Sequence, residues 1–490
     1  MTDVRLMPAA LTAWAVTAAG IAWGYAAAGA AVLCGVAGTL AAGWWASRRR
    51  GDAARADRKP VLVAAVAVAL VGSGFAIAVC LRVDAVRHHL VTTRLGSVAE
   101  VVVTPDETPR ALEGGRTMFR GSLARLDGAP SSGAVLVFAS GADYAALQAG
   151  RPAGFRARVS RPSRRDLTVA VLSATGRPRL GDAAPVYRLA HRIRAGFADA
   201  VRLVLPVDQA ALLPALVLGD TSTVPAQTAK DFRVAGLTHL MAVSGANITI
   251  VCGAMLFSAA LLGPRIAVVL AAVTLAGFVV VVQPSASVLR AAVMGAITLL
   301  AVLTHRQRQA LPALGAAVIV LMIATPALAV DVGFALSVSA TAGLIVVAPV
   351  WSRRLTHRGW PRPLADAVSV ALAAQLVTAP LVAGVSGSVS LVAVLANLVV
   401  APVIPPITLI GTAAAALCPL WPAGAQLLIR FTGPEVWWLA SVARWAAAVP
   451  AAALPVPSGL AGVAVVAVAS CTVAAVWHWG LSGRRGTIVR

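Results

Sequence analysis

Charged residues are scarce in this chain, and acidic residues are scarcer than basic ones. Only 12% of the 490 residues are charged, with 19 acidic against 41 basic side chains. A soluble domain carries about 25% charged residues, so that class is excluded. A hydrophobic content of 59% and a mean hydropathy of +0.83 instead predict a polytopic α-helical membrane protein. The net charge of +22, almost all from arginine, favours anionic partners, either lipid headgroups or nucleic acid.

Three chemical signatures are missing. The five cysteines lie in apolar runs without a CxxC pair, which is typical of small apolar residues rather than a disulfide framework or zinc site. No GxxxxGK[ST] loop is present to bind a nucleoside triphosphate. The seven histidines form no HxHxDH cluster to hold two metals. We therefore expect no cofactor and no bound metal.

The first three apolar runs lie near 9–27, 28–46 and 60–81. We interpret the first as a membrane span rather than a cleaved signal, because a second run follows at once. The loop "SRRRGDAARADRKP" (47–60) is strongly basic, which predicts a cytoplasmic position. The amino terminus is then cytoplasmic, and the third span takes the chain outside.

Residues 84–185 have a different character. Runs rich in β-formers are separated by Gly, Pro and Asp turns, at 97–104, 133–139, 154–160 and 166–173. This pattern predicts a small extracytoplasmic β-barrel or sandwich. Basic residues outnumber acidic ones here, which indicates either a solvated surface or one that faces phosphates. The candidate phosphate contacts are Arg156, Arg158, Arg161, Arg164 and Arg165.

A basic amphipathic helix is predicted over 187–206. Leu189, Ile193 and Phe197 repeat at helical spacing, whereas Arg188 and Arg192 take other faces and are further phosphate candidates. Such a helix is expected to lie in the plane of the lipid headgroups.

The remainder of the chain is almost continuously apolar. Nine further spans are expected, near 237–262, 265–282, 286–303, 309–329, 333–350, 364–385, 390–418, 434–449 and 459–480. The basic connectors at 304–309 and 351–362 then fall on the cytoplasmic side, giving twelve spans with both termini in the cytoplasm of a plasma membrane protein. Three prolines in "ANLVVAPVIPP" (396–406) are able to divide one span into two half-helices.

These features divide the chain into five parts. They are a three-span region (1–83), a β domain (84–185), an interfacial helix and connector (186–235), a membrane core (236–482) and a basic cytoplasmic tail (483–490).

Four polar motifs interrupt the apolar sequence: "ALVLGDTS" (215–222), "GLTHLMAVSGANI" (236–248), "QPSASVLRAAVMG" (283–295) and "DVGFALSVSATAG" (331–343). Ionisable groups within a membrane are costly and usually face a bundle interior or an aqueous path. Asp220, His239, Arg290 and Asp331 lie near predicted span ends, which favours a shared polar interior.

Two interpretations of the second motif remain open. On an unbroken helix Ser244 and Asn247 share a face, and His239 lies about 140° around from Ser244. These side chains either hydrogen-bond between helices that pack closely at Gly245 or line the path of a transported strand.

The other motifs leave similar alternatives. Arg290 is either a phosphate contact in a pore or the partner of Asp331 or of backbone carbonyls. Pro284 and Ser285 are expected in a turn that starts a span. Asp220, after Gly219, either caps the next helix or belongs to the functional motif.

The four motifs, in this order, resemble the ComEC family of competence proteins, and the resemblance extends over essentially the whole chain. It implies a channel for uptake of single-stranded DNA and an OB-fold-like extracytoplasmic β domain. It also implies an external DNA receptor and a cytoplasmic ATPase or helicase as partners, and a homo-oligomer is compatible with it. Longer members carry a carboxy-terminal metallo-β-lactamase-like domain. Because its histidine motif is missing here, we expect any nuclease to be a separate polypeptide.

Two other function classes compete with a channel. An intramembrane serine hydrolase would use Ser244 as nucleophile, with a histidine base from another span. However, His305 and His357 lie in basic connectors and His478 ends the last span. A small-molecule transporter is the third class, but a basic β domain gives it no advantage. The residues favour a channel without enzymatic activity.

Overall fold

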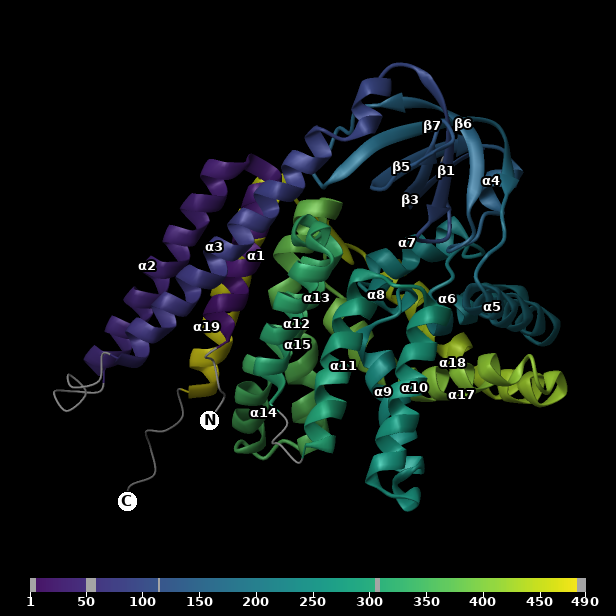
Figure 1. The fold of residues 1–490 in the computed structure, drawn as a ribbon. Coiled ribbons are helices and arrows are strands. Elements are labelled where there is room, and N and C mark those ends of the chain that lie inside the picture. The colour runs from purple at the N-terminus through teal and green to yellow at the C-terminus, as the bar shows by residue number, and fades with distance from the viewer. Residues whose placement is uncertain (1–5, 50–58, 113–114, 305–308, 483–490) are drawn as a thin grey trace, which may run out of the picture. The chain divides into compact units, whose positions relative to one another are not determined.

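The computed structural model describes residues 6–49, 59–112, 115–304 and 309–482, which are mostly helical with one β domain (Figure 1). Most of the basic loop at 47–60, the connector residues 305–308 and the tail at 483–490 lie outside the described residues. The chain divides into two compact units. The first unit comprises Met1–His191, Val279–Leu289 and Gln307–Asp331, and the second comprises Arg192–Phe278, Arg290–Arg306 and Val332–Arg490.

Eight helical segments in the described part of the chain are long and apolar enough to cross a membrane. They are Tyr25–Trp44, Val61–Arg94, Pro264–Val282, Ala286–Leu303, Val332–Thr356, Arg362–Ser386, Ala393–Leu417 and Gly459–Gly480. Each coincides with a run predicted from the sequence. The prediction of a polytopic helical membrane protein is confirmed at this level.

The other four predicted spans correspond to helices that are shorter or more polar. Helices α1 (Met7–Trp23), α9 (Gly245–Ser258) and α12 (Ala310–Ala324) have 17, 14 and 15 residues. A span needs about 20 residues at a rise of 1.5 Å each. Helix α12 ends where Pro326 begins a 3₁₀ turn, because the residue before a proline disfavours helical geometry. Helix α18 (Pro422–Ala448) is long enough but carries three charged residues, Arg430, Glu435 and Arg444.

Prolines interrupt the predicted span at 390–418. Helix α16 (Ala393–Val400) passes through a 3₁₀ turn, η6 (Ala401–Val403), into helix α17 (Ile404–Leu417). Pro402, Pro405 and Pro406 each lack the N–H that an α-helix needs. The helix is therefore divided at the prolines, but Ala393–Leu417 as a whole remains one segment long enough to cross a membrane, so its division into two half-spans stays a prediction.

The first unit contains four apolar helices and the β domain. Helix α1 packs against α2 (Tyr25–Arg49), α3 (Lys59–Arg87) and α12, and the 3₁₀ turn η5 (Pro326–Val330) follows α12. A 3₁₀ turn, η2 (Leu90–Arg94), leads from α3 into the β domain. Several hydrogen bonds join this domain to other parts of the unit. Arg165 Nη1 donates to the carbonyl of Ala22 at 3.0 Å, and the amide of Thr108 donates to Gln283 Oε1 at 3.2 Å.

The β domain is a closed barrel of five main strands. They are β1 (Val98–Pro105), β3 (Arg116–Leu126), β5 (Ala134–Ser140), β6 (Ala153–Ser160) and β7 (Thr168–Leu180). Strand β1 pairs with both β3 and β6, which closes the sheet in the order β1-β6-β7-β5-β3. All pairings between these strands are antiparallel except β5 with β7. Two short strands, β2 (Arg110–Ala111) and β4 (Ala129–Pro130), pair with β3.

The barrel encloses its own hydrophobic core. Burial alternates along the strands, as a half-buried sheet requires. Val101, Phe119 and Val137 are completely buried. Tyr144 of the short helix α4 (Ala142–Ala145) packs edge-on against Phe155, with ring centroids 5.6 Å apart. The predicted small β domain is therefore confirmed as a barrel with an independent core.

The second unit holds most of the remaining helices. Helix α5 (Pro185–Val204) confirms the helix predicted at 187–206 and crosses the boundary between the units. The following elements are α6 (Val207–Leu218), α7 (Ala226–Val234), α8 (Thr238–Met241), α9, η4 (Ala260–Leu262), α10 (Pro264–Val282), α11 (Ala286–Leu303), α13 (Val332–Val346), α14 (Ala348–Thr356), α15 (Arg362–Ser386), β8 (Ser388–Ser390), α16 to α18, β9 (Ala453–Pro455) and α19 (Gly459–Ser482). Helices α10 and α11 also cross the unit boundary.

Candidate functional site

The second motif does not form the unbroken helix assumed from the sequence. Helix α8 ends at Met241, Ala242 is extended, and Ser244 is the N-cap of α9 with φ −102° and ψ 166°. The angle expected between His239 and Ser244 on one helix is therefore wrong. The physical reason is local, because serine and glycine favour a new helix start over continuation.

The break joins this motif to the first one. Asn247, which is buried, donates through Nδ2 to the carbonyl of Leu216 at 3.2 Å. That carbonyl belongs to the last turn of α6, where the chain leaves the helix through Gly219 with φ +70°. A Cβ at Gly219 would lie 3.3 Å from Val243 Cγ2. The first two motifs are thus in direct contact within the second unit.

Ser244 has a local structural partner. Its hydroxyl donates to Asn247 Oδ1 at 3.0 Å, which holds the amide in the orientation that reaches Leu216. No histidine side chain hydrogen-bonds Ser244 among the residues that the structure describes. His239 itself is exposed on α8.

Arg290 joins the third motif to the fourth. Its side chain is buried, with 7% of the residue exposed. Nε donates to Ser337 Oγ at 2.8 Å, and Nη1 donates to Thr341 Oγ1 and contacts Met294 Sδ at 3.5 Å. Ser337 and Thr341 lie one turn apart on α13. Within the described ranges Arg290 forms no ion pair, so neutral hydroxyl groups hold a buried cation.

Gly245 lies beside the same guanidinium. A Cβ at this position would be 2.9 Å from Arg290 Nη2 and 3.2 Å from Ala291 Cβ. The absence of a side chain therefore lets the start of α9 approach α11. The second, third and fourth motifs meet at this point, which we call the Arg290 site: Gly245, Arg290, Ser337 and Thr341.

Asp220 is held by Arg194, a residue that no sequence motif singles out. Arg194 of α5 donates through Nη1 to the carbonyl of Leu218 at 2.9 Å, and its Nη2 lies 3.5 Å from Asp220 Oδ2. Burial lowers the pKa of Arg194, and the charge of Asp220 opposes this shift. The other Asp220 oxygen accepts from the amide and hydroxyl of Ser222 at 3.2 and 2.6 Å. Asp220 therefore orders the turn after α6 and anchors α5 to it.

Three predicted residues belong to segments of the first unit. Pro284 and Ser285 are exposed in the connection between α10 and α11, and Ser285 Oγ accepts from the amide of Val288 at 3.3 Å at the start of α11. Asp331 is half-buried at the end of η5. Its participation in a shared polar interior stays a prediction.

The predicted phosphate contacts are exposed. Arg156 and Arg158 alternate along β6 with the buried Phe155 and Ala157, so they point away from the barrel core. Three others lie in the loop between β6 and β7: Arg161, Arg164 and Arg165. On α5, Arg188 and Arg192 are also exposed, and Arg188 Nη1 donates to the carbonyl of Ala183 at 2.8 Å.

The site chemistry is therefore cationic and polar. Over the described ranges of the chain, no group of three or more His, Cys, Asp and Glu side chains is arranged to hold a metal ion. The Arg290 site offers guanidinium N–H donors and hydroxyls, a set that suits an anion with several oxygen acceptors.

Comparisons with known proteins agree with this distribution of motifs. A family model described as "Competence protein" matches residues 216–481, more than half of the chain. The ComE operon protein 3 of Bacillus subtilis (strain 168) is 26% identical over 201 residues, which cover 41% of this chain and 25% of that protein. The chain thus matches about a quarter of the length of this curated relative. No solved structure matches the chain. The matched segment also contains the residues whose contacts link the four motifs: Leu216, Gly245, Arg290 and Thr341. Because the family model covers more than half of the chain, the chain belongs to the competence protein family.

Proposed function

We propose that this protein is an integral membrane channel that passes single-stranded DNA inward across the plasma membrane during natural transformation. Membership of the competence protein family and eight apolar helices support a membrane role in DNA uptake. We further propose twelve spans with both termini in the cytoplasm, on the basis of the basic connectors in the sequence.

The main support for the proposal is that Arg290 is buried and forms no ion pair among the described residues. A cation buried among membrane helices is costly unless it is paired. Here Ser337 and Thr341 satisfy part of its hydrogen-bonding capacity but none of its charge. A phosphate group supplies the missing negative charge and accepts from several N–H donors. Because the hydroxyls hold the guanidinium in place before the phosphate arrives, each passing phosphate finds an oriented donor.

Transport also requires that such a contact be brief. A strand carries one phosphate per nucleotide, and a conduit in which every phosphate bound tightly would stall. A single buried arginine beside a glycine meets this requirement. Gly245 lets the start of α9 approach Nη2 without a clash, while Ser244 and Asn247 fix the helix ends around it.

The β-barrel would gather the strand outside the membrane. We propose that it is an OB-type barrel, an assignment supported by the parallel pairing of β5 with β7 and by a helix between β5 and β6. In such barrels the loop between the fourth and fifth strands contributes to nucleic-acid binding. Here that loop carries Arg161, Arg164 and Arg165, whose contacts would depend on phosphate and not on sequence.

Partners complete this scheme. The sequence contains no GxxxxGK[ST] loop, so the driving force would come from a cytoplasmic ATPase or helicase. An external DNA receptor would deliver the strand, and a separate nuclease would remove its complement. Anionic lipids would attract α5, and self-association into a homo-oligomer is compatible with the proposal.

The alternative functions gain no specific support. A serine nucleophile needs a base to take its proton, whereas the Ser244 hydroxyl donates to an amide oxygen that cannot act as one. A small-molecule transporter would not need the basic barrel loop.

The proposal is tested by replacing Arg290. Arg290→Gln removes the charge, Arg290→Lys keeps it, and Arg265→Gln, at the exposed start of α10, is the matched control. Loss of a charge-assisted hydrogen bond is worth about 1.5–3 kcal/mol, which corresponds to a roughly tenfold to hundredfold loss of transformation frequency. We expect Arg290→Lys to retain part of the activity.

Membrane abundance of each variant is measured by immunoblot, because a destabilised bundle would imitate a blocked path. A normal transformation frequency of Arg290→Gln at normal membrane abundance would refute the proposed contact between Arg290 and phosphate. Equal loss in the Arg265→Gln control would show that the effect is one of general charge.

A further inference from the structure

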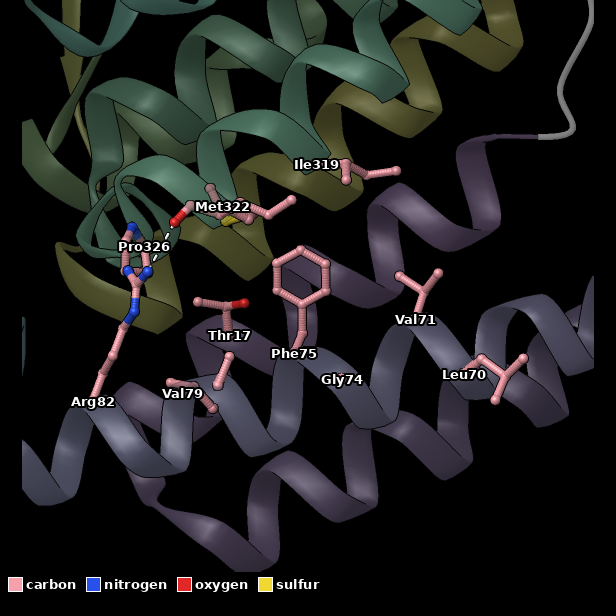
Figure 2. A pocket seen from close by; sticks show the side chains of 12 residues that line it. Thr17, Leu70, Val71, Gly74, Phe75, Val79, Arg82, Ile319, Met322 and Pro326 are labelled. Atoms are coloured by element: carbon pink, nitrogen blue, oxygen red, sulfur yellow. Dashed lines mark hydrogen bonds between the residues drawn. The ribbon is translucent and has the colours of Figure 1, made fainter.

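An apolar cavity opens between three helices of the first unit. Its volume is about 380 Å³, and it is formed by α1, α3 and α12. Figure 2 shows Phe75 and Val71 of α3 on one side and Met322 and Ile319 of α12 on the other, and Thr17 of α1 also lines the cavity. This volume lies within the range of small-molecule sites.

One charged residue, Arg82, stands at one end of this cavity. It is the one charged side chain among the described residues that line it. Nη2 donates to the carbonyl of Ile323 at 2.9 Å, in the last turn of α12, where helix carbonyls lack partners (Figure 2). A guanidinium has five N–H donors in a planar fork. The residue is exposed, so donors that do not reach Ile323 are accessible from outside the protein.

The length of the cavity matches half of a bilayer. Its lining along α3 extends from Leu70 to Arg82. At a rise of 1.5 Å per residue this distance is about 18 Å, and one leaflet of the hydrocarbon core is about 15 Å deep. The chain beyond Arg82 becomes polar with Asp84, Arg87 and His88, as expected at the membrane surface. The cation therefore lies at headgroup level above a slot one leaflet deep.

We propose that this cavity holds one anionic phospholipid, with its phosphate on Arg82 and one acyl chain along Val71, Gly74 and Phe75. An apolar slot accepts the chain, and a guanidinium with open donors selects the negative headgroup. This inference is independent of the proposed DNA path, because every lining residue lies in the first unit and outside the Arg290 site.

Filling the slot is the first test. Gly74 lines the cavity, and a Cβ added there would meet no atom within 4 Å, so Gly74→Leu places a side chain at the cavity wall. Gly38→Leu on α2 is the matched control, since a Cβ there also meets no atom and Gly38 does not line the cavity. The full-length chain, purified in detergent, is incubated with phosphatidylglycerol and phosphatidylcholine of identical acyl chains. Retained lipid is then counted by native mass spectrometry.

Removing the cation is the second test. Arg82→Gln is compared with Arg87→Gln, a control on the same helix whose guanidinium lies over the ring of Tyr25 and not in the cavity. The parent chain should retain one phosphatidylglycerol with about a fivefold preference over phosphatidylcholine. Gly74→Leu should lose both lipids, and Arg82→Gln should keep lipid but lose the preference.

Each result decides the proposal. Retention of phosphatidylglycerol by Gly74→Leu at the parent level would place the lipid elsewhere. If Arg82→Gln kept the preference for phosphatidylglycerol over phosphatidylcholine, the role of Arg82 would be limited to capping the end of α12. If Gly74→Leu elutes as an aggregate in size-exclusion chromatography, the Arg82→Gln comparison still decides the matter.

Discussion

Replacing Gly245 should damage the protein far more than replacing the neighbouring Ser244. A Cβ at 245 would lie 2.9 Å from Arg290 Nη2, closer than side chains normally approach, and 3.2 Å from Ala291 Cβ. The guanidinium is tied to Ser337 and Thr341, so moving it breaks a charged hydrogen bond. That loss is about 1.5–3 kcal/mol, and a leucine adds about 1–3 kcal/mol of overpacking. Gly245→Leu is therefore expected to cost roughly 3–6 kcal/mol.

Ser244→Ala removes much less. The Ser244 hydroxyl donates to Asn247 Oδ1 and to no backbone N–H, although it occupies the N-cap of α9. This bond lies within one helix start, and we take as an upper guide the average of about 0.6 kcal/mol for a polar contact between membrane helices. We therefore expect Ser244→Ala to retain most of its activity.

The assay is transformation frequency in a transformable host that depends on this gene, with membrane abundance measured in parallel. Gly253→Leu is the matched control, because Gly253 lies on the same helix and a Cβ there meets no atom within 4 Å. We expect Gly253→Leu to resemble the parent and Gly245→Leu to lose nearly all transformation. Loss of activity in Ser244→Ala together with normal activity in Gly245→Leu would refute this reasoning and favour a nucleophilic serine.

Three further predictions concern topology, the barrel surface and its stability. A reporter that is active only outside the cytoplasm should be active when it is fused after residue 120 and inactive when it is fused after residue 54 or 356. An inactive fusion at residue 120 would contradict an external position of the barrel. The isolated domain at 84–185 should bind single-stranded DNA with an affinity that falls steeply as salt concentration rises. In a fluorescence titration, replacing Arg161, Arg164 and Arg165 with alanine should make this salt dependence weaker. An affinity that does not change with salt would contradict a role of the domain in the DNA path. Asp106 is exposed by surface area, but partial desolvation of its carboxyl raises its pKa above the ordinary value of 3.8, with the hydrogen bond from Ser122 opposing this shift and the charge of Glu107 adding to it. The stability that Asp106 contributes is thus present below its unfolded pKa and is lost as pH rises through the folded pKa. Asp106→Asn should raise the thermal unfolding midpoint of the barrel at neutral pH but not at a pH well below 3.8. An equal effect at the two pH values would show that titration of Asp106 is not the cause.

Regular elements were largely predictable from the sequence. Long apolar runs predicted the eight membrane-length helices, and periodicity predicted α5 to within two residues at each end. Prolines at 402, 405 and 406 predicted the division of α16 from α17. These features depend on local patterns, which a sequence displays directly.

The contacts of the site were not predictable in the same way. Ser337 and Thr341 looked like ordinary hydroxyl residues of a span, and the Thr341 hydroxyl indeed also donates to the carbonyl of Ser337 at 2.8 Å. Arg194 is one of several arginines on α5, and only its position against Leu218 distinguishes it. The break at Ala242 was missed because the apolar run continues across it. The contacts of Ser337, Thr341 and Arg194 depend on packing between segments distant in sequence, whereas the break at Ala242 has a local cause that the surrounding apolar residues concealed.

Closure of the β-barrel restricts how other molecules can engage it. An open sheet presents backbone N–H and C=O groups along its edge, and a partner or a second copy can extend it by adding a strand. Strand β1 is paired on both sides, with β3 and with β6, so it offers no such edge, and the edges that remain open are short, such as the end of β7 beyond Ser173. Side chains and loops therefore make up most of the surface available for recognition, and a copy that pairs through β1 has to open the β1–β3 or β1–β6 seam first.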